Sequence, residues 1–194
     1  MEAPLRTAPL LLAASLALGG CNREPPLRTV SDFDAPRYLG TWHEIAAIPA
    51  WFQRDCASDT TADYAPVPEA AEIAVTNSCR TADGGLRTAL GRARFTGPAN
   101  EGRLEVTFVD FGGYWLWPIS GAYDVLALDP NYRWSLVGHP SRRYAWILAR
   151  EPSLDPATLT LLRDRLVAER YDPCQLIVTA KEDPRRGQSL CAVD

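Results

Sequence analysis

Eight short segments with strand-type patterns follow one another between residues 38 and 150, and turn-forming residues separate them. The segments are 38–48, 58–64, 72–78, 86–96, 103–110, 122–128, 134–138 and 144–150. In the fourth, Arg92 and Arg94 alternate with Gly91, Ala93 and Phe95, which indicates one apolar and one solvent-facing side. Eight antiparallel strands joined by short turns most simply close into a barrel, because closure removes exposed edges. The sequence therefore predicts an all-β fold, an eight-stranded antiparallel up-and-down β-barrel.

The residue pattern changes after the eighth segment. Asp155 suits a helix N-cap and Pro156 the first helical position, and leucines then recur at helical spacing to about residue 169. These leucines are Leu159, Leu162 and Leu166. We expect a C-terminal α-helix that packs its leucines on the outside of the barrel, followed by a short final strand at residues 176–180.

Length and composition narrow the possible functions. The 194 residues suffice for one well-buried domain. A net charge of −4 argues against a nucleic-acid partner, because phosphate binding requires a basic surface. The chain has no glycine-rich phosphate-binding loop, and two histidines, His43 and His139, are too few for a histidine-rich metal site. The sequence predicts no cofactor and no metal site.

The amino terminus has the pattern of an export signal. Residues 8–20 form an apolar run of signal-peptide length that is too short to cross a bilayer comfortably. The two glycines before Cys21 resemble the bacterial lipobox, in which the cysteine receives acyl chains and becomes the new N-terminus. This resemblance implies a lipoprotein signal peptide at residues 1–20 and stable membrane anchoring through lipidated Cys21.

The residues after Cys21 bear on location. Asn22 is not the aspartate that retains lipoproteins in the inner membrane of enteric bacteria, so the lipobox resemblance implies the outer membrane. The stretch 21–31 contains two consecutive prolines and is predicted to be a tether between the lipid anchor and the folded domain.

The remaining four cysteines are an even number in an exported chain, which favours two disulfides among Cys56, Cys79, Cys174 and Cys191. Three connectivities are possible. A hairpin of the second and third strands, centred near residues 67–68, would pair Cys56 with Cys79, Thr60 with Val75 and Ala62 with Ile73. Directly opposed Cβ atoms lie about 4.5–5.5 Å apart, close to disulfide reach. We therefore favour Cys56 with Cys79, which leaves Cys174 with Cys191.

Three motifs together resemble the lipocalin family. They are Gly40-Thr41-Trp42 at the first strand, YDVLALDPNY at 123–132 and WILAR at 146–150. The resemblance covers residues 32–194 and is greatest for the branch that contains bacterial outer-membrane lipoproteins and apolipoprotein D. It implies that Arg150 lies over the indole of Trp42 and closes one end of the barrel.

The same resemblance makes Gly40, Trp42 and Arg150 structural residues rather than ligand contacts. The chain departs from the branch at His43, where tyrosine is usual, and in a tryptophan-rich loop at 112–119. Both departures bear on which ligand is bound rather than on the fold.

A lipocalin barrel implies a binding function, because eight strands enclose just enough space for one small ligand. Alternation from Trp42 turns Glu44 and Ala46 inward. The predicted ligand-binding residues, on the wall and at the open end, are Trp51, Phe52, Thr60, Ala62, Tyr64, Ile73, Val75, Phe95, Val106, Phe108, Tyr114, Trp115, Trp117, Tyr123 and Val125. Core packing is the alternative for the wall. Trp115 and Trp117 have three interpretations: a ligand gate, membrane contact, or incidental packing.

The sequence favours a lipocalin anchored to the periplasmic face of the outer membrane that stores or transports a small hydrophobic ligand, a fatty acid or lysophospholipid. We predict no enzymatic activity, since no nucleophile or acid–base pair has convincing spacing and Glu44 is interpreted as a hydrogen-bonded buried carboxyl. The alternatives are a lipocalin-fold enzyme acting on a lipid or isoprenoid, and an envelope scaffold with a filled barrel. The ligand's identity and the formation of a homodimer stay open.

Overall fold

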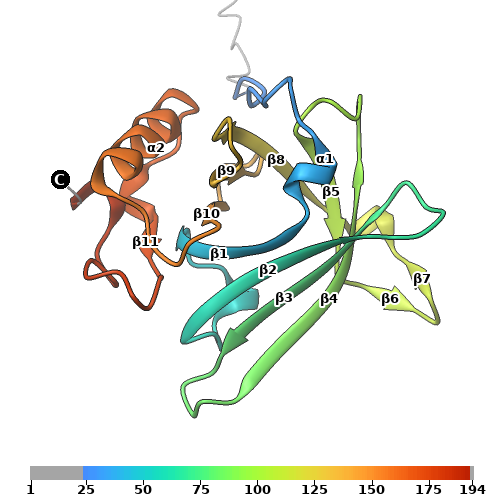
Figure 1. The fold of residues 1–194 in the computed structure, drawn as a ribbon, viewed down its shortest axis with the longest axis horizontal. Coiled ribbons are helices and arrows are strands. Elements are labelled where there is room, and N and C mark those ends of the chain that lie inside the picture. Colours follow the sequence, from blue (N-terminus) through green and yellow to red (C-terminus); the bar gives the residue numbers. More distant parts are fainter. Residues whose placement is uncertain (1–23, 193–194) are drawn as a thin grey trace, which may run out of the picture.

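The computed structural model describes residues 24–192 and shows a closed barrel of eight antiparallel strands (Figure 1). Neighbours along the chain pair in turn, and the last strand pairs with the first, which confirms the predicted up-and-down barrel. The barrel strands are β1 (Gly40–Ala47), β2 (Ser58–Pro66), β3 (Ile73–Arg80), β4 (Leu86–Phe95), β5 (Arg103–Thr107), β8 (Gly121–Leu128), β9 (Trp134–Gly138) and β10 (Ala145–Ala149).

The structure also contains shorter helices and strands. They are α1 (Ala35–Tyr38), η1 (Trp51–Gln53), β6 (Asp110–Phe111), β7 (Tyr114–Trp115), η2 (Trp117–Ile119), η3 (Pro173–Gln175), β11 (Ile177–Val178) and η4 (Leu190–Ala192). The strand predicted at 103–110 ends at Thr107, and the chain then leaves the wall as the hairpin β6–β7, which Figure 1 shows projecting from the barrel. Gly112 and Gly113 form its turn with positive φ angles, which glycine adopts without steric cost.

The C-terminal helix α2 (Pro156–Ala168) forms and packs as predicted. The carboxylate of Asp155 accepts a hydrogen bond from the backbone N–H of Thr158 at 2.9 Å, which satisfies one free donor of the first turn. The three predicted leucines are fully buried in an outer core between α2 and the barrel, together with Leu126, Leu136 and Ile147. After α2, β11 adds to the edge of β1 and is shorter than the predicted 176–180.

Trp42 and Arg150 close the barrel at one end, as the resemblance implied. The indole of Trp42 is completely buried, its Nε1–H donates to the carbonyl of Tyr38 at 2.8 Å, and the Arg150 guanidinium lies 3.8 Å from its ring centroid. Arg150 also donates to the carbonyls of Thr41 and Leu39 at 2.7 and 2.8 Å. This end, called the floor below, is therefore held by a cation–π contact and backbone hydrogen bonds.

Both predicted disulfides are present: Cys56 is bonded to Cys79 and Cys174 to Cys191. The strand register used to predict the first was wrong by four residues. Tyr64 opposes Val75 and Ala62 opposes Asn77, because the hairpin turns around Glu69 in a left-handed conformation rather than around residues 67–68. Cys56 lies before β2, and an irregularity between Ser58 and Thr61 brings it to Cys79. Because the register shift is an even number of residues, each side chain still points to the face that was predicted for it.

An irregularity in β1 also corrects the position of Ala46. The pairing of β1 with β10 shifts between Glu44 and Ala46, and Ala46 then opposes Ile147 in the outer core. A bulge inserts one residue and reverses the side to which later residues point. Ala46 therefore faces α2, and the residue that continues the inner face is Ala47, opposite Trp146.

The segment predicted as a tether is partly folded against the domain. Leu27 is buried in the outer core, and the backbone N–H of Val30 donates to the carbonyl of Val125 at 2.9 Å. Apolar side chains in the proline-containing stretch account for this docking. The predicted signal peptide and the lipidation site Cys21 lie outside the described residues. Within residues 24–192, no helix is long and apolar enough to cross a bilayer.

Candidate ligand-binding site

The inner wall of the barrel is apolar. Its buried side chains form an inner core of Phe33, Tyr38, Trp42, Tyr64, Ile73, Val75, Ala93, Leu104, Val125, Tyr132, Val137 and Leu148. Four further predicted wall residues pack against this core while remaining partly exposed: Ala62, Phe95, Val106 and Tyr123. The structure thus brings eight of the predicted residues onto one surface inside the barrel.

The barrel interior is open to solvent away from the floor. Trp42, Ala62, Asn77 and Ala89 oppose one another across β1 to β4 and therefore share the inner face. Ala62 and Asn77 are nevertheless partly exposed, and Ala89 is exposed. Phe108 lies against the backbone of Gly91 and is 44% exposed. Inward-facing side chains that contact water indicate that the barrel is open at the end away from the floor.

Three tyrosines form a hydrogen-bonded group above the floor. The hydroxyl of Tyr123 lies 2.8 Å from that of Tyr38 and 2.9 Å from that of Tyr64, and Tyr38 also contacts Ser135 at 3.0 Å. Burial raises the pKa of Tyr38 to about 12 and raises the pKa values of Tyr64 and Tyr123 as well. The hydroxyls therefore stay protonated and partner one another, so the tyrosine group carries no charge.

The turn η1 covers part of the open end. The ring of Phe52 lies 5.7 Å from that of Tyr144 and 6.4 Å from that of Trp146, whereas Trp51 is 73% exposed. Gln53 connects the turn to the barrel: its Nε2 donates to Glu44 at 2.7 Å, and its Oε1 accepts from the Trp146 indole at 3.2 Å. Phe52 thus lies near the interior as predicted, while Trp51 extends into solvent.

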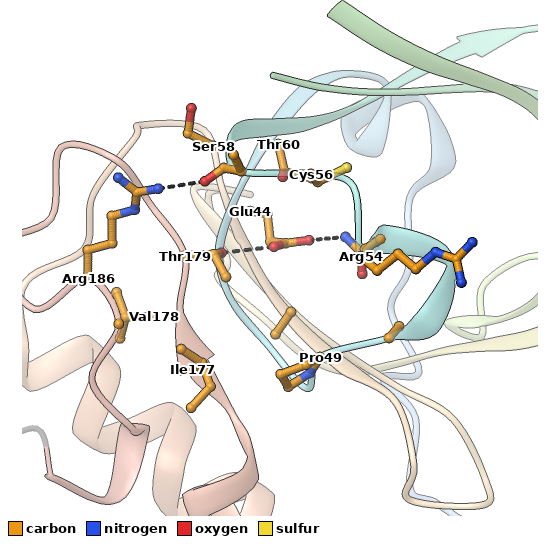
Figure 2. A pocket seen from close by; sticks show the side chains of 15 residues that line it. Glu44, Pro49, Arg54, Cys56, Ser58, Thr60, Ile177, Val178, Thr179 and Arg186 are labelled. Carbon is orange, nitrogen blue, oxygen red and sulfur yellow. Dashed lines mark hydrogen bonds between the residues drawn. The ribbon is translucent and has the colours of Figure 1, made fainter. Parts of the chain in front are cut away.

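Glu44 is a buried carboxyl at the side of the barrel (Figure 2). Its Oε1 accepts from the Thr179 hydroxyl at 2.8 Å, and its Oε2 accepts from Gln53. Burial raises the pKa of Glu44, and these two hydrogen bonds partly oppose the rise. The hydrogen-bonded interpretation of Glu44 is confirmed. Thr60, predicted as a wall residue, lies beside Glu44 in the lining of a lateral pocket.

The tryptophan-rich loop does not lie where the sequence suggested. The guanidinium of Arg92 lies 5.0 Å from the ring centroid of Trp115, and that of Arg94 lies 4.1 Å from that of Trp117. Both arginines alternate with inward residues of β4 and so belong to the outer face, where Glu105 pairs with Arg94 at 2.6 Å. Cation–π contacts hold the two indoles on the outer wall. Their predicted position at the mouth of the barrel is wrong, and Tyr114, 78% exposed on the projecting hairpin, does not line the interior either.

Comparisons with known proteins agree with this geometry. A family model described as "Lipocalin-like domain" matches residues 33–181. The chain is 38% identical over 156 residues to the outer membrane lipoprotein Blc of Escherichia coli K12, which covers 77% of this chain and 83% of Blc.

The chain belongs to the lipocalin family.

Two further proteins are similar to this lipocalin. The lipocalin is 33% identical over 172 residues to apolipoprotein D of Macaca fascicularis, covering 86% of this chain and 85% of that protein. Insecticyanin from the tobacco hornworm Manduca sexta shares its fold, with a TM-score of 0.63 and 22% identity over 85% of this chain and 89% of insecticyanin. Members of the family are generally binding proteins rather than enzymes. Across the described part of this lipocalin, no group of three or more histidine, cysteine or acidic side chains is arranged to hold a metal ion.

Asn77, Ala89 and Gln53 are among the residues near the interior that were not predicted as ligand contacts from the sequence. Asn77 and Ala89 lie on the inner face, and alternation from Val75 and Gly91 is the signal that could have found them. Asn77 Oδ1 is buried and has no hydrogen-bond partner within residues 24–192. The role of Gln53 could not be predicted from the sequence, because it depends on how η1 folds back over the barrel.

Proposed function

We propose that this lipocalin binds one single-chain lipid, a fatty acid or a lysophospholipid, inside its barrel, and stores or transports it at the outer membrane. The observation that carries the proposal is the combination of an apolar inner wall, a floor closed by Trp42, and inward-facing residues exposed to solvent toward the open end. Concave, mostly apolar sites with a few polar groups are the usual form of small-molecule binding sites.

The chemistry of the wall favours an acyl chain lying toward the floor. Each methylene that moves from water to the wall contributes about 0.8 kcal/mol. The tyrosine group presents no charge to the tail, because its hydroxyls are protonated and partnered. The polar head would stay near the solvent-exposed part of the interior, where Asn77 is partly exposed and Ala89 is exposed.

The proposed location is the periplasmic face of the outer membrane. The lipobox resemblance at Cys21 and the name of the relative Blc, an outer membrane lipoprotein, support it. We infer binding rather than catalysis, because the inward carboxyl of Glu44 has both oxygens occupied by hydrogen bonds and four cysteines are paired in disulfides.

A pair of substitutions on adjacent residues of β4 tests the site. Ala89 faces inward, whereas the next residue, Leu90, faces outward and is 63% exposed. We expect Ala89→Trp to weaken binding of a fatty acid and of a lysophospholipid by at least about tenfold, because the indole occupies space needed by the chain. Leu90→Trp should leave both affinities unchanged. Isothermal titration calorimetry of the two variants and the wild type measures this.

The titration can contradict the proposal in two ways. Equal affinities of Ala89→Trp and Leu90→Trp for both lipids would place binding outside the barrel. No measurable affinity of the wild-type protein for either lipid would exclude these two ligand classes. Thermal unfolding of both variants serves as the control for folding, since both substitutions replace exposed residues.

A further inference from the structure

A cavity of about 360 Å³ lies at the side of the barrel (Figure 2). It exists because β1 changes partners along its length. Residues 40–43 pair with β2, but after the irregularity Ala46 and Ala47 pair with β11. β2 and β11 therefore diverge, and the cavity fills the space between them under the loop that carries η1. Its volume is at the lower end of the range of about 300–1,000 Å³ for small-molecule sites.

Gln53 lies at the border between this lateral pocket and the barrel interior. Gln53 joins Glu44 on the pocket side to Trp146 on the interior side through two hydrogen bonds. The apolar part of the pocket lining consists of Ala47, Pro49, Ala50, Ile177 and Val178. A ligand here would thus meet an apolar surface beside the inner core.

The pocket carries one cationic side chain with unused donors. Arg186 reaches across the rim and donates from Nη2 to the carbonyl of Ala57 at 2.5 Å, as Figure 2 shows. A guanidinium has five N–H donors, and Arg186 makes no ion pair with any residue between 24 and 192. Arg54 also lines the pocket, but Figure 2 shows its guanidinium pointing away.

No exposed carboxylate competes for Arg186 inside the pocket. Glu44 is the acidic residue of the lining, and its carboxyl is buried and held by Thr179 and Gln53. Burial raises the pKa of Glu44, which disfavours a negative charge at the base of the pocket. Asp59 on β2 forms an ion pair with Lys181, with 3.4 Å between Oδ2 and Nζ. Asp59 is not one of the residues that line the pocket.

We propose that the lateral pocket is a second ligand site that takes the anionic head, a carboxylate or phosphate, of a short single-chain amphiphile. Arg186 would bind the head through paired N–H groups, the geometry in which guanidinium recognises both anions. The first methylenes would lie on Ile177, Val178 and Pro49. The site is independent of the lipid proposed for the barrel.

Calorimetric titration of the Ala89→Trp protein, whose barrel is blocked, isolates this pocket. The probes are decanoate, decyl phosphate, neutral decanol and inorganic phosphate. We expect one equivalent of decanoate or decyl phosphate to bind, and the added substitution Arg186→Gln to weaken both by at least about tenfold. Arg143→Gln, which removes an exposed arginine of the β9–β10 turn, is the matched control and should change nothing.

A second variant controls for an effect of Arg186→Gln on folding. Ser58→Trp fills the pocket from the β2 side and should abolish binding of both anionic amphiphiles while the thermal midpoint is retained. Affinity for decanoate that is unchanged by either variant would overturn the proposal. Decanol binding that falls as much as decanoate binding, or inorganic phosphate binding as tight as decyl phosphate binding, would overturn the assigned ligand class. Wild-type binding that vanishes entirely in Ala89→Trp would place all ligand in the barrel and leave the lateral pocket without one.

Discussion

Replacing Trp42 with alanine is expected to lower the free energy of unfolding by about 3–5 kcal/mol, the cost observed when a large aromatic side chain is removed from a core. The indole is fully buried in the inner core, so its loss leaves a cavity at the floor that neighbouring strands cannot fill without moving. The substitution also removes the ring beneath Arg150 and the hydrogen bond to the Tyr38 carbonyl. Urea denaturation followed by circular dichroism measures the loss.

The matched control for this change is Trp51→Ala. Trp51 is 73% exposed, and substitution of exposed residues usually changes stability by no more than about 0.5 kcal/mol. Equal free energies of unfolding for the Trp42→Ala and Trp51→Ala proteins would contradict the inference that Trp42 stabilises the floor of the barrel. Such a result would also contradict the assignment of the Gly40-Thr41-Trp42 motif as structural.

Removing the bridge between Cys56 and Cys79 with two alanines is expected to lower the free energy of unfolding by about 3 kcal/mol. The two cysteines are separated by 23 residues, and a bridge of this span restricts the unfolded chain by about that amount in the chain-entropy model. The bridge also fastens the start of β2 to β3 where their register is irregular. We expect the η1 turn and the lateral pocket to be loosened as a result.

The second bridge provides the comparison. Cys174 and Cys191 are separated by 17 residues, and the same model gives about 3 kcal/mol for their removal. Denaturation of both double variants without reductant, with free thiols counted beforehand, separates the two contributions. A loss below about 1 kcal/mol for the Cys56 and Cys79 variant would show that this bridge does not restrict the unfolded chain.

The barrel and the helix could be predicted because their signals are local. The alternating residues of segment 86–96 and the Asp155–Pro156 start of α2 depend only on neighbours in the sequence, and the structure reproduces both. The disulfide pairing could also be predicted, since an even register error leaves side chains on the same face and the irregularity in β2 makes up the remaining distance.

The features that the sequence did not predict depend on contacts between distant residues. The bulge that turns Ala46 outward has no sequence signal, because Ala46 and Ala47 are the same residue type. Trp115 and Trp117 look like interior aromatics until Arg92 and Arg94 are known to lie beside them on the outer wall. The lateral pocket depends on β1 exchanging β2 for β11, and such a change of partner is set by the tertiary fold.

The same distinction between local signals and long-range contacts applies to the positions of the candidate ligand contacts. Wall residues such as Tyr64, Val75 and Val106 follow from alternation, and they lie in or against the inner core. Loop residues such as Trp51 and Tyr114 do not, because loop conformation is fixed by contacts that periodicity does not encode. Predicted ligand contacts on strands are therefore better founded here than those on loops.

The central claim is that the open barrel of this lipocalin holds one single-chain lipid. Native mass spectrometry of the protein, gently extracted from bacterial envelopes, tests it most directly. The account predicts a population heavier than the denatured protein by the mass of one fatty acid or lysophospholipid, and loss of that population in Ala89→Trp but not in Leu90→Trp. A wild-type protein that is persistently empty, and that gains no adduct when either lipid is added, would contradict the account.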